Sequence, residues 1–309
     1  MENELKEPLE RGVAEVIGGE ELKKKLSSGE KLRIKFGIDP TSPNIHIGHA
    51  VPILKLRDFQ KLGHQIVLIV GDFTAVIGDT SDKDSERPML SQETVEENKK
   101  SYFDQIGKII DLNKAELRHN SEWLSPLTYR EIGEHADVFS VSDFIARDNI
   151  KRRLDAGKRV SLREVLYPLM QGYDSVAVEA DVELGGVDQR FNLLAGRSLQ
   201  ERFNQDPQAI LTTPLIEGLD GRKMSKSYGN TVSLTDSHED MYGKIMSVAD
   251  QYVRTYFVNC TRVPISEIDS LSEGHPKDFK MRLAFEIVKI YHGEEKARLA
   301  EENFVESFS

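Results

Sequence analysis

The chain has 309 residues, and its 41 Lys and Arg against 52 Asp and Glu residues give a formal net charge of −11 at pH 7, which excludes a protein that coats nucleic acid indiscriminately but leaves room for a local basic face. A single cysteine, Cys260, excludes an internal disulfide framework, and no apolar run reaches the roughly 20 residues that span a membrane. Together with an N-terminal stretch that is acidic rather than arginine-rich, these features predict a soluble, cytoplasmic protein with room for about two domains.

The first predicted strand runs directly into a predicted helix. Residues 20–26 indicate a short leading helix, and residues 32–38 then alternate apolar and polar side chains over the length of a strand. The connecting stretch, 36–50, reads FGIDPTSPNIHIGHA. Beyond it Gly63 is placed to end a helix. The apolar residues at helical spacing before that glycine are Ala50, Ile53, Leu54, Leu56 and Phe59.

His46 and His49 belong to the first turn of that helix. They are three residues apart and so project from the same face. The N-terminus of a helix carries unpaired N–H groups and the positive end of the dipole, so phosphate is its natural ligand. Gly48 leaves the space between the two imidazoles open to a ligand. The alternative is that the string HIGH arises by chance in an ordinary surface turn.

The next segment predicts a buried strand with polar residues behind it. Residues 64–71 form an almost continuous β-branched run, typical of a parallel strand covered on both faces. Asp72, Thr74 and Asp79 follow its carboxyl end, where α/β sheets bind ligands. Asp and Gly at such positions also form ordinary turns, and that alternative stays open.

Helix and strand patterns continue to alternate through the middle of the chain. A long amphipathic helix is predicted over 93–110, a short strand over 116–119 and two further helices within 126–150. The alternation indicates an α/β fold with a Rossmann-like, doubly wound parallel sheet. Seven Lys and Arg residues gather within 147–163, where solvated helix faces are expected for most of them and contact with an RNA backbone for some.

A polar stripe is predicted on the helix that follows. Ser161 and Glu164 form a capping box, so a helix should begin one residue after the serine. Tyr167, Gln171 and Asp174 stand at i, i+4 and i+7 and project from one face. A phenol, an amide and a carboxylate among apolar neighbours favour the lining of a small polar pocket. A stripe facing solvent is the rival interpretation.

A glycine pair precedes a second polar cluster. Residues 181–192 read DVELGGVDQRFN, a short strand followed by Gly185 and Gly186 and then by Asp188 and Gln189. Paired glycines let the backbone approach a ligand, and a carboxylate just beyond such a turn commonly binds ribose hydroxyls. An ordinary tight turn is the alternative.

The last motif is a polar loop, residues 218–230, which reads GLDGRKMSKSYGN. Lys223 and Lys226 are point charges suited to a triphosphate, and the glycines allow the loop to move. Alone, KMSKS would be a solvated basic turn. HIGH and KMSKS in this order resemble the two ATP-binding motifs of class I aminoacyl-tRNA synthetases.

With the YxxxQxxD helix and GGxDQ between them, the motifs resemble the bacterial tyrosyl-tRNA synthetases over nearly the whole chain. Tryptophanyl-tRNA synthetases share only the fold and the two outer motifs. The resemblance implies residues for the amino acid, for ribose and for the ATP phosphates. For tyrosine they are Asp79, Tyr167 and Gln171 at the ammonium group, Asp174 at the phenolic hydroxyl and Gln189 at the carboxylate. For ATP they are Gly186 and Asp188 at the ribose and Thr41, His46, Gly48, His49, Lys223 and Lys226 at the phosphates.

Two positions depart from the family pattern. Lys35 stands where many members have a tyrosine, so we expect it near Asp174, where it would influence the charge of that carboxyl group. The loop after Asp79 reads TSDK instead of the commoner PSGK. This difference leaves open whether Lys83 is a phosphate ligand.

The resemblance further implies tyrosine–tRNA ligase activity on L-tyrosine, ATP and tRNA(Tyr). Mg²⁺ would be carried by the ATP phosphates, with no protein-bound metal. A homodimer without membrane attachment is expected. Another nucleotidyl transferase, for instance a pantothenate synthetase, would not need the two central motifs, and a non-catalytic RNA-binding or scaffold protein would not need both lysines.

Beyond residue 235 the strand and helix alternation stops, and residues 279–291 predict a strong helix. We therefore expect a catalytic domain over 1–235, with a helical insertion near 125–160 and the loop 218–230, and a helical domain over 236–309. The chain ends inside a helical pattern, with Phe304 and Phe308 lacking an evident partner. Because the family commonly continues into a further small RNA-binding domain, a shortened chain is expected.

Overall fold

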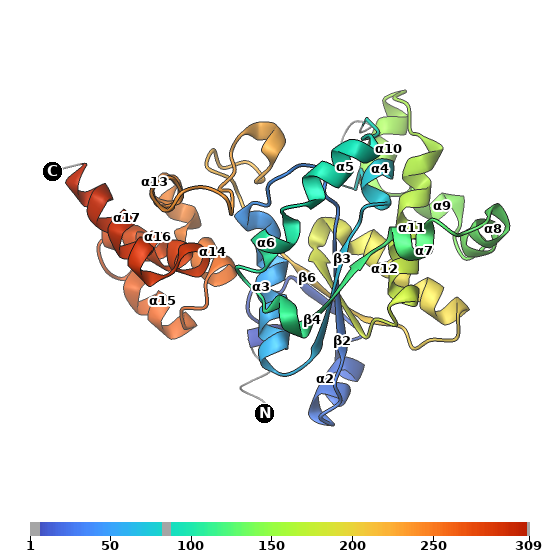
Figure 1. Ribbon diagram of the computed structural model, residues 1–309, viewed down its shortest axis with the longest axis horizontal. Coiled ribbons are helices and arrows are strands. Elements are labelled where there is room, and N and C mark those ends of the chain that lie inside the picture. The colour runs from blue at the N-terminus through green and yellow to red at the C-terminus, as the bar shows by residue number, and fades with distance from the viewer. Residues whose placement is uncertain (1–6, 82–87, 308–309) are drawn as a thin grey trace.

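The computed structural model describes residues 7–81 and 88–307, and a six-stranded sheet forms its centre (Figure 1). The strands stand in the order β1-β6-β5-β2-β3-β4, and each neighbouring pair is parallel except β1 with β6. This confirms the predicted doubly wound α/β fold. The strands are β1 (Glu15–Ile17), β2 (Arg33–Ile38), β3 (Gln65–Val70), β4 (Ala115–His119), β5 (Val182–Gly186) and β6 (Ala209–Thr213).

The order of the strands places a ligand crevice between β2 and β5. From β2 the chain continues to β3 and β4 on one side, whereas β5 and β6 lie on the other. In an open α/β sheet, ligands bind at the carboxyl ends of the strands where the order reverses in this way. Residues 66–70 of β3 are fully buried, as expected for a parallel strand covered on both faces.

The short strand β1 was not predicted, because three residues are too few to show an alternating pattern. Arg11, just before it, is buried and lies against the C-terminal end of helix α14 (Asp250–Cys260). Its Nε donates to the carbonyl oxygen of Val258 at 2.9 Å, Nη1 to that of Val263 at 2.8 Å and Nη2 to that of Phe257 at 3.1 Å. The N-terminal segment is thereby fixed to the last third of the chain.

The helices expected over 20–26 and after HIGH are present, and the short helix α4 (Thr74–Ile77) was not predicted. The single helix expected over 93–110 is wrong, because it is interrupted at Ser101. There Ser101 donates from Oγ to the carbonyl oxygen of Pro43 at 3.0 Å, and Gln105 Oε1 accepts from the N–H of Ile45 at 2.7 Å. These bonds to a distant turn fix the break. The helices are α2 (Gly19–Ser27), α3 (Ile47–Lys61), α4 (Thr74–Ile77), α5 (Gln92–Lys99) and α6 (Tyr102–Ile106), with a 3₁₀ turn η1 (Leu112–Lys114) before β4.

The predicted capping box of Ser161 and Glu164 is present at the start of α11. Glu164 also accepts two bonds from Arg153, at 2.5 and 3.1 Å, and both side chains are buried. Part of the basic region 147–163 is therefore internal. Three helices begin within 126–150, where two were expected. The helices of this part are α7 (Ser121–Leu124), α8 (Tyr129–Ala136), α9 (Val141–Ile145), α10 (Asp148–Asp155), α11 (Leu162–Ala177) and α12 (Arg190–Arg202), with the 3₁₀ turn η2 (Val187–Gln189) before α12.

Between residues 235 and 307 all the regular elements are helices, as expected, and they stand to one side of the sheet (Figure 1). Phe304, for which the sequence showed no partner, packs on Tyr242 with ring centroids 5.4 Å apart. Phe308 lies outside the described residues, and the domain boundary at 235 stays a prediction. No helix in the described part of the chain is long and apolar enough to cross a membrane. After the 3₁₀ turn η3 (Lys226–Tyr228) the helices are α13 (His238–Met246), α14, α15 (Ile265–Ser272), α16 (Pro276–His292) and α17 (Glu294–Glu306).

Candidate active site

The turn that carries HIGH is joined to the segment that follows the KMSKS loop. His46 is the extended N-cap residue of α3 and forms a β-bridge with Ser233. Beside it, the N–H of Ile47 donates to the carbonyl oxygen of Val232 at 2.9 Å. The two predicted ATP-binding motifs, far apart in the sequence, therefore meet at the N-terminus of one helix.

The two histidine rings of this turn are stacked on each other. The centroids of His46 and His49 are 3.7 Å apart, with 24° between the ring planes. A Cβ added to Gly48 would lie only 3.0 Å from the ring of His46, so the glycine is needed for this close approach. Burial, together with the charges of Lys226 and Lys223, lowers the pKa of His46 to about 3. The imidazole of His46 is therefore neutral at physiological pH.

The KMSKS loop is folded onto the turn that precedes HIGH. Lys226 donates from Nζ to Ser42 Oγ and to the carbonyl oxygen of Asn44, and burial lowers the pKa of this lysine to about 8. Lys223 forms an ion pair with Asp188 Oδ2 at 3.1 Å. Lys223 is thus paired with Asp188, which is itself predicted to bind ribose. Lys226 contacts two residues that closely follow Thr41, which is predicted to bind phosphate.

Asp174, on α11, is buried and accepts hydrogen bonds from two side chains. Its Oδ1 accepts from Trp123 Nε1 at 2.8 Å, and its Oδ2 from Asn120 Nδ2 at 3.3 Å. Burial raises the pKa of Asp174 to about 7, although the charge of Lys35 acts in the opposite direction. Sequence reasoning missed Trp123 and Asn120. Their signal was their position directly after β4, at the carboxyl edge of the sheet where ligands bind.

Asp39 is a second carboxyl group that sequence reasoning missed. It accepts from Tyr167 Oη at 2.8 Å and from Thr74 Oγ1 at 2.7 Å. Burial, assisted by the charges of Asp79 and Asp174, raises the pKa of Asp39 to about 7. Burial and the charges of the same three aspartates also raise the pKa of Tyr167. The phenol of Tyr167 therefore lies among three carboxyl groups.

Asp79 and Gln189 connect the two sides of the crevice. Gln189 Nε2 donates to Asp79 Oδ2 at 2.8 Å, and Gln189 Oε1 accepts from Asn192 Nδ2 at 3.0 Å. Asp79 Oδ1 also accepts from the N–H and the hydroxyl of Ser81, at 2.9 and 2.6 Å. The residues predicted for the ammonium and carboxylate groups of one amino acid are thus in direct contact.

Lys35 is completely buried beneath α11 and is close enough to Asp174 to affect its pKa. Its Nζ forms an ion pair with Glu183 Oε1 at 2.8 Å and donates to Ser175 Oγ at 2.7 Å and to the carbonyl oxygen of Gln171 at 3.0 Å. Gln171 Nε2 in turn donates to Glu183 Oε1 at 3.3 Å. The ammonium group of Lys35 is therefore fully hydrogen-bonded within the protein. The sequence did not reveal that this lysine pairs with Glu183.

The other predicted residues fall around the same crevice. Thr41 donates from its N–H to the carbonyl oxygen of Asp39 at 2.8 Å. A Cβ on Gly186 would lie 2.5 Å from Asp188 Oδ1, so a larger residue here would displace the carboxylate of Asp188. Asp72 holds the start of α7 instead, since it accepts from the N–H and hydroxyl of Ser121 at 3.0 and 2.9 Å. Lys83 lies outside the described residues.

No group of three or more His, Cys, Asp and Glu side chains within the described ranges could hold a metal ion. The site has two parts. The lysines of KMSKS beside HIGH form a cationic part, and the carboxyl groups around Tyr167 form an acidic part. An ammonium group suits the acidic part and a polyphosphate suits the cationic part.

Comparisons with known proteins agree with this arrangement. Residues 4–309 match the family model of tRNA synthetases class I (W and Y). The tyrosine–tRNA ligase of Thermotoga maritima is 47% identical over 97% of this chain and 77% of its own, and that of Moorella thermoacetica is 46% identical over 97% and 75%.

Solved structures show the same fold. A C-terminally truncated mitochondrial tyrosyl-tRNA synthetase of Coccidioides posadasii is similar at a TM-score of 0.77 and 27% identity, covering 97% of this chain and 90% of its own. The tyrosyl-tRNA synthetase of Archaeoglobus fulgidus complexed with L-tyrosine has a TM-score of 0.76 at 24% identity, over 97% of this chain and 99% of its own. On this evidence the chain belongs to the class I tRNA synthetases of the tryptophan and tyrosine group.

Proposed function

We propose that this enzyme activates L-tyrosine with ATP to give tyrosyl-adenylate and pyrophosphate, and then transfers the tyrosyl group to the 3′-terminal adenosine of tRNA(Tyr). The observation that carries the proposal is the buried, hydrogen-bonded carboxyl group of Asp174 on the helix that also carries Tyr167, whose phenol lies among carboxyl groups. Such a site suits an amino acid with a polar end to its side chain. The names of relatives with 45 to 47% identity support this assignment.

The acidic part would bind the ammonium group of tyrosine. Asp79, Tyr167 and Gln171 would contact it, and Asp39 would hold the phenol of Tyr167 in place through the 2.8 Å bond between them. A bound cation stabilises ionised carboxylates, so it would lower the pKa of Asp39, which burial raises to about 7 in the free enzyme. Gln189 would lie beside the substrate carboxylate and orient it toward ATP.

Asp174 would accept the phenolic hydroxyl of the substrate. Trp123 and Asn120 already donate to this carboxyl group, so its orientation is fixed before the substrate enters. A substrate without a hydroxyl would bring no third donor to this buried carboxyl group, and a buried acceptor site left without a partner costs about 1 to 3 kcal/mol, more when it is charged. Tryptophan offers only an N–H on a larger ring system. This difference favours tyrosine over the other amino acid of the family.

The chemical step needs alignment rather than a base. A carboxylate oxygen of tyrosine attacks the α-phosphorus of ATP, and the bond to the bridging oxygen breaks as pyrophosphate leaves with its electron pair. The carboxylate is already ionised, so no proton has to be removed. His46, neutral because its pKa is lowered to about 3, would donate a hydrogen bond to the phosphates without adding a charge.

Two contacts in the KMSKS loop would be exchanged when ATP binds. Lys223 forms an ion pair with Asp188 at 3.1 Å, and ribose hydroxyls reaching Asp188 and Gly186 would release the lysine toward the phosphates. Lys226 would exchange Ser42 and Asn44 for the leaving pyrophosphate. Its charge would then count most in the transition state, where negative charge moves onto the departing group.

The remaining parts of the proposal rest on the family resemblance. Mg²⁺ would arrive on the ATP phosphates, because this ion usually keeps several waters and binds through substrate phosphates. We also propose that the enzyme acts in the cytoplasm as a symmetric homodimer. Sedimentation of the purified chain would test the dimer directly.

Amino-acid-dependent exchange of labelled pyrophosphate into ATP tests the proposed activation step. Tyrosine should support exchange, whereas phenylalanine and tryptophan should support at most about a hundredth of that rate, as expected where a buried polar group is left unpaired. Lys226→Ala is the matched variant for the cationic part, and it should lower the rate with every amino acid. Equal exchange with tryptophan and tyrosine would refute the assignment of the substrate.

A further inference from the structure

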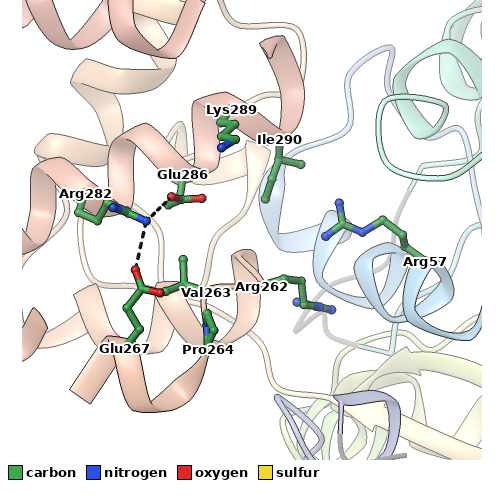
Figure 2. A pocket seen from close by; sticks show the side chains of 9 residues that line it. All are labelled: Arg57, Arg262, Val263, Pro264, Glu267, Arg282, Glu286, Lys289 and Ile290. Carbon is green, nitrogen blue, oxygen red and sulfur yellow. Dashed lines mark hydrogen bonds and ion pairs between the residues drawn. The ribbon is translucent and has the colours of Figure 1, made fainter. Parts of the chain in front are cut away.

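A second hollow lies outside the crevice, between α3 and the C-terminal helices (Figure 2). Its volume is about 280 Å³, just below the roughly 300 to 1,000 Å³ of pockets for drug-sized ligands. It has room for a small ion with its waters. The lining comes from Arg57 on α3, from Arg262, Val263, Pro264 and Glu267 around the start of α15, and from Arg282, Glu286, Lys289 and Ile290 on α16.

The cationic side chains around this hollow outnumber the carboxylates. Arg282 donates to Glu267 at 3.1 Å and to Glu286 at 2.9 Å, so both carboxylates of the lining are bound to the same arginine (Figure 2). On the opposite side Arg262 is bound to Asp58 at 2.8 Å. These pairs account for the acidic groups that line the hollow and leave Arg57 to be neutralised.

Arg57 is the unusual member of the lining. Its Nε is buried, and no acceptor in residues 7–81 and 88–307 lies within hydrogen-bonding distance of it. Burial and the neighbouring charge of Arg262 lower the pKa of Arg57, and Asp58, which offsets them in part, is already bound to Arg262. A guanidinium group stays charged in proteins, so it gains most from an anion in such a place.

Tyr291 adds a second polar group near Arg57 and Arg262. Its side chain is 94% buried, since 6% of it is exposed, and its hydroxyl has no hydrogen-bond partner within the described ranges. Burial raises the pKa of Tyr291 and the two arginines act to lower it, which places all three groups in one electrostatic environment. A buried hydroxyl normally has a partner. The region therefore holds more donors than acceptors.

We propose that this hollow binds a phosphate group, either as the free ion or in an RNA backbone, with Arg57 as its main ligand. The fork of a guanidinium matches two phosphate oxygens at once. Lys289 lies on the exposed rim of the hollow (Figure 2). Its Nζ forms an ion pair with Glu294 at 3.0 Å, and a phosphate in the hollow would compete with Glu294 for this cation. Arg282, Glu286 and Lys289 stand at i, i+4 and i+7 and so share the face of α16 that borders the hollow.

Occupation of this site would connect the C-terminal helices to the helix that carries HIGH. Arg57 lies on α3 eight residues beyond His49, about 12 Å along the helix axis. A phosphate bound between α3 and α16 would stabilise their packing, and binding to the folded state alone raises its stability. The site shares no residue with the predicted nucleotide site, and it lies near the opposite end of α3.

Calorimetric titration of the full chain with inorganic phosphate, against sodium chloride at matched ionic strength, tests the proposal. Arg57→Gln should weaken phosphate binding about tenfold or more, because a charge-assisted bond is lost. Arg254→Gln is the matched control: this arginine is exposed on α14, pairs with Asp269 and does not line the hollow. It should change the dissociation constant less than about twofold.

A second variant guards against misfolding of the first. Lys289 is exposed, so Lys289→Gln should fold and should weaken phosphate binding about two- to threefold. Equal dissociation constants for the parent, Arg57→Gln and Lys289→Gln would overturn the proposal. In a separate arm, weaker binding of a tRNA(Tyr) transcript by Arg57→Gln, with competition by phosphate, would identify RNA as the source. Unchanged RNA binding with lost phosphate binding would identify the free ion.

Discussion

Replacing the buried carboxyl group of Asp174 by an amide should make the protein more stable above neutral pH while impairing tyrosine activation. Burial raises the pKa of Asp174 from 3.8 to about 7. Between those values the folded protein holds a proton that the unfolded chain has released, so the free energy of unfolding falls as pH rises through this window. From pH 5 to pH 7 the loss is roughly 2 to 3 kcal/mol, and Asp174→Asn should remove it.

Urea unfolding at pH 5 and pH 8 measures this effect. The parent should lose about 2 to 3 kcal/mol more than Asp174→Asn over that interval. Asp269→Asn is the control, because this aspartate is exposed on α15 and its replacement should leave the pH dependence unchanged. Parallel pH dependence of the parent and Asp174→Asn would refute the reasoning. So would full tyrosine activation by the variant, because the amide has one accepting oxygen where the carboxylate has two.

Three further predictions concern the same crevice. Lys226→Ala should slow tyrosyl-adenylate formation about a hundredfold in single-turnover kinetics with little change in tyrosine affinity; an unchanged rate with weaker affinity would contradict it. Lys35→Met should cost about 3 to 5 kcal/mol in urea unfolding, because Glu183 is left buried and unpaired, and the double variant Lys35→Met/Glu183→Gln should recover most of that loss; no recovery would exclude the pair as the cause. Asp174→Ala should narrow the preference for tyrosine over phenylalanine in pyrophosphate exchange, Trp123→Phe should do so to a smaller extent and Lys35→Ala least; an unchanged preference in Asp174→Ala would place hydroxyl recognition elsewhere.

The sequence predicted the strands and helix ends that depend only on neighbouring residues. Residues 66–70 had to form a buried strand because every side chain among them is apolar and branched. HIGH before a helical pattern, and the capping box at Ser161 and Glu164, specify helix ends through neighbouring residues alone. The fold class followed from the alternation of these elements, and the structure and the comparisons confirm it.

Contacts between distant segments could not be predicted in the same way. The break at Ser101 depends on the carbonyl oxygen of Pro43, and nothing within the helical pattern reveals it. Likewise, the hydrogen bond from Trp123 to Asp174 and the ion pair of Lys35 with Glu183 join residues on different elements. The positions of these residues along the chain do not show which of them touch. The packing of α11 on the sheet determines those contacts.

The attachment of Arg11 to the end of α14 has a consequence for the order in which the protein can fold during its synthesis. Its acceptors, at residues 257, 258 and 263, emerge from the ribosome about 250 residues later, which takes on the order of 10 to 50 seconds. The partner of β1, strand β6, is also made late. Until then Arg11 lacks its carbonyl acceptors and β1 lacks its neighbouring strand, whereas β2, β3 and α3 can already pack. Closure of the N-terminal segment should therefore be among the last folding steps.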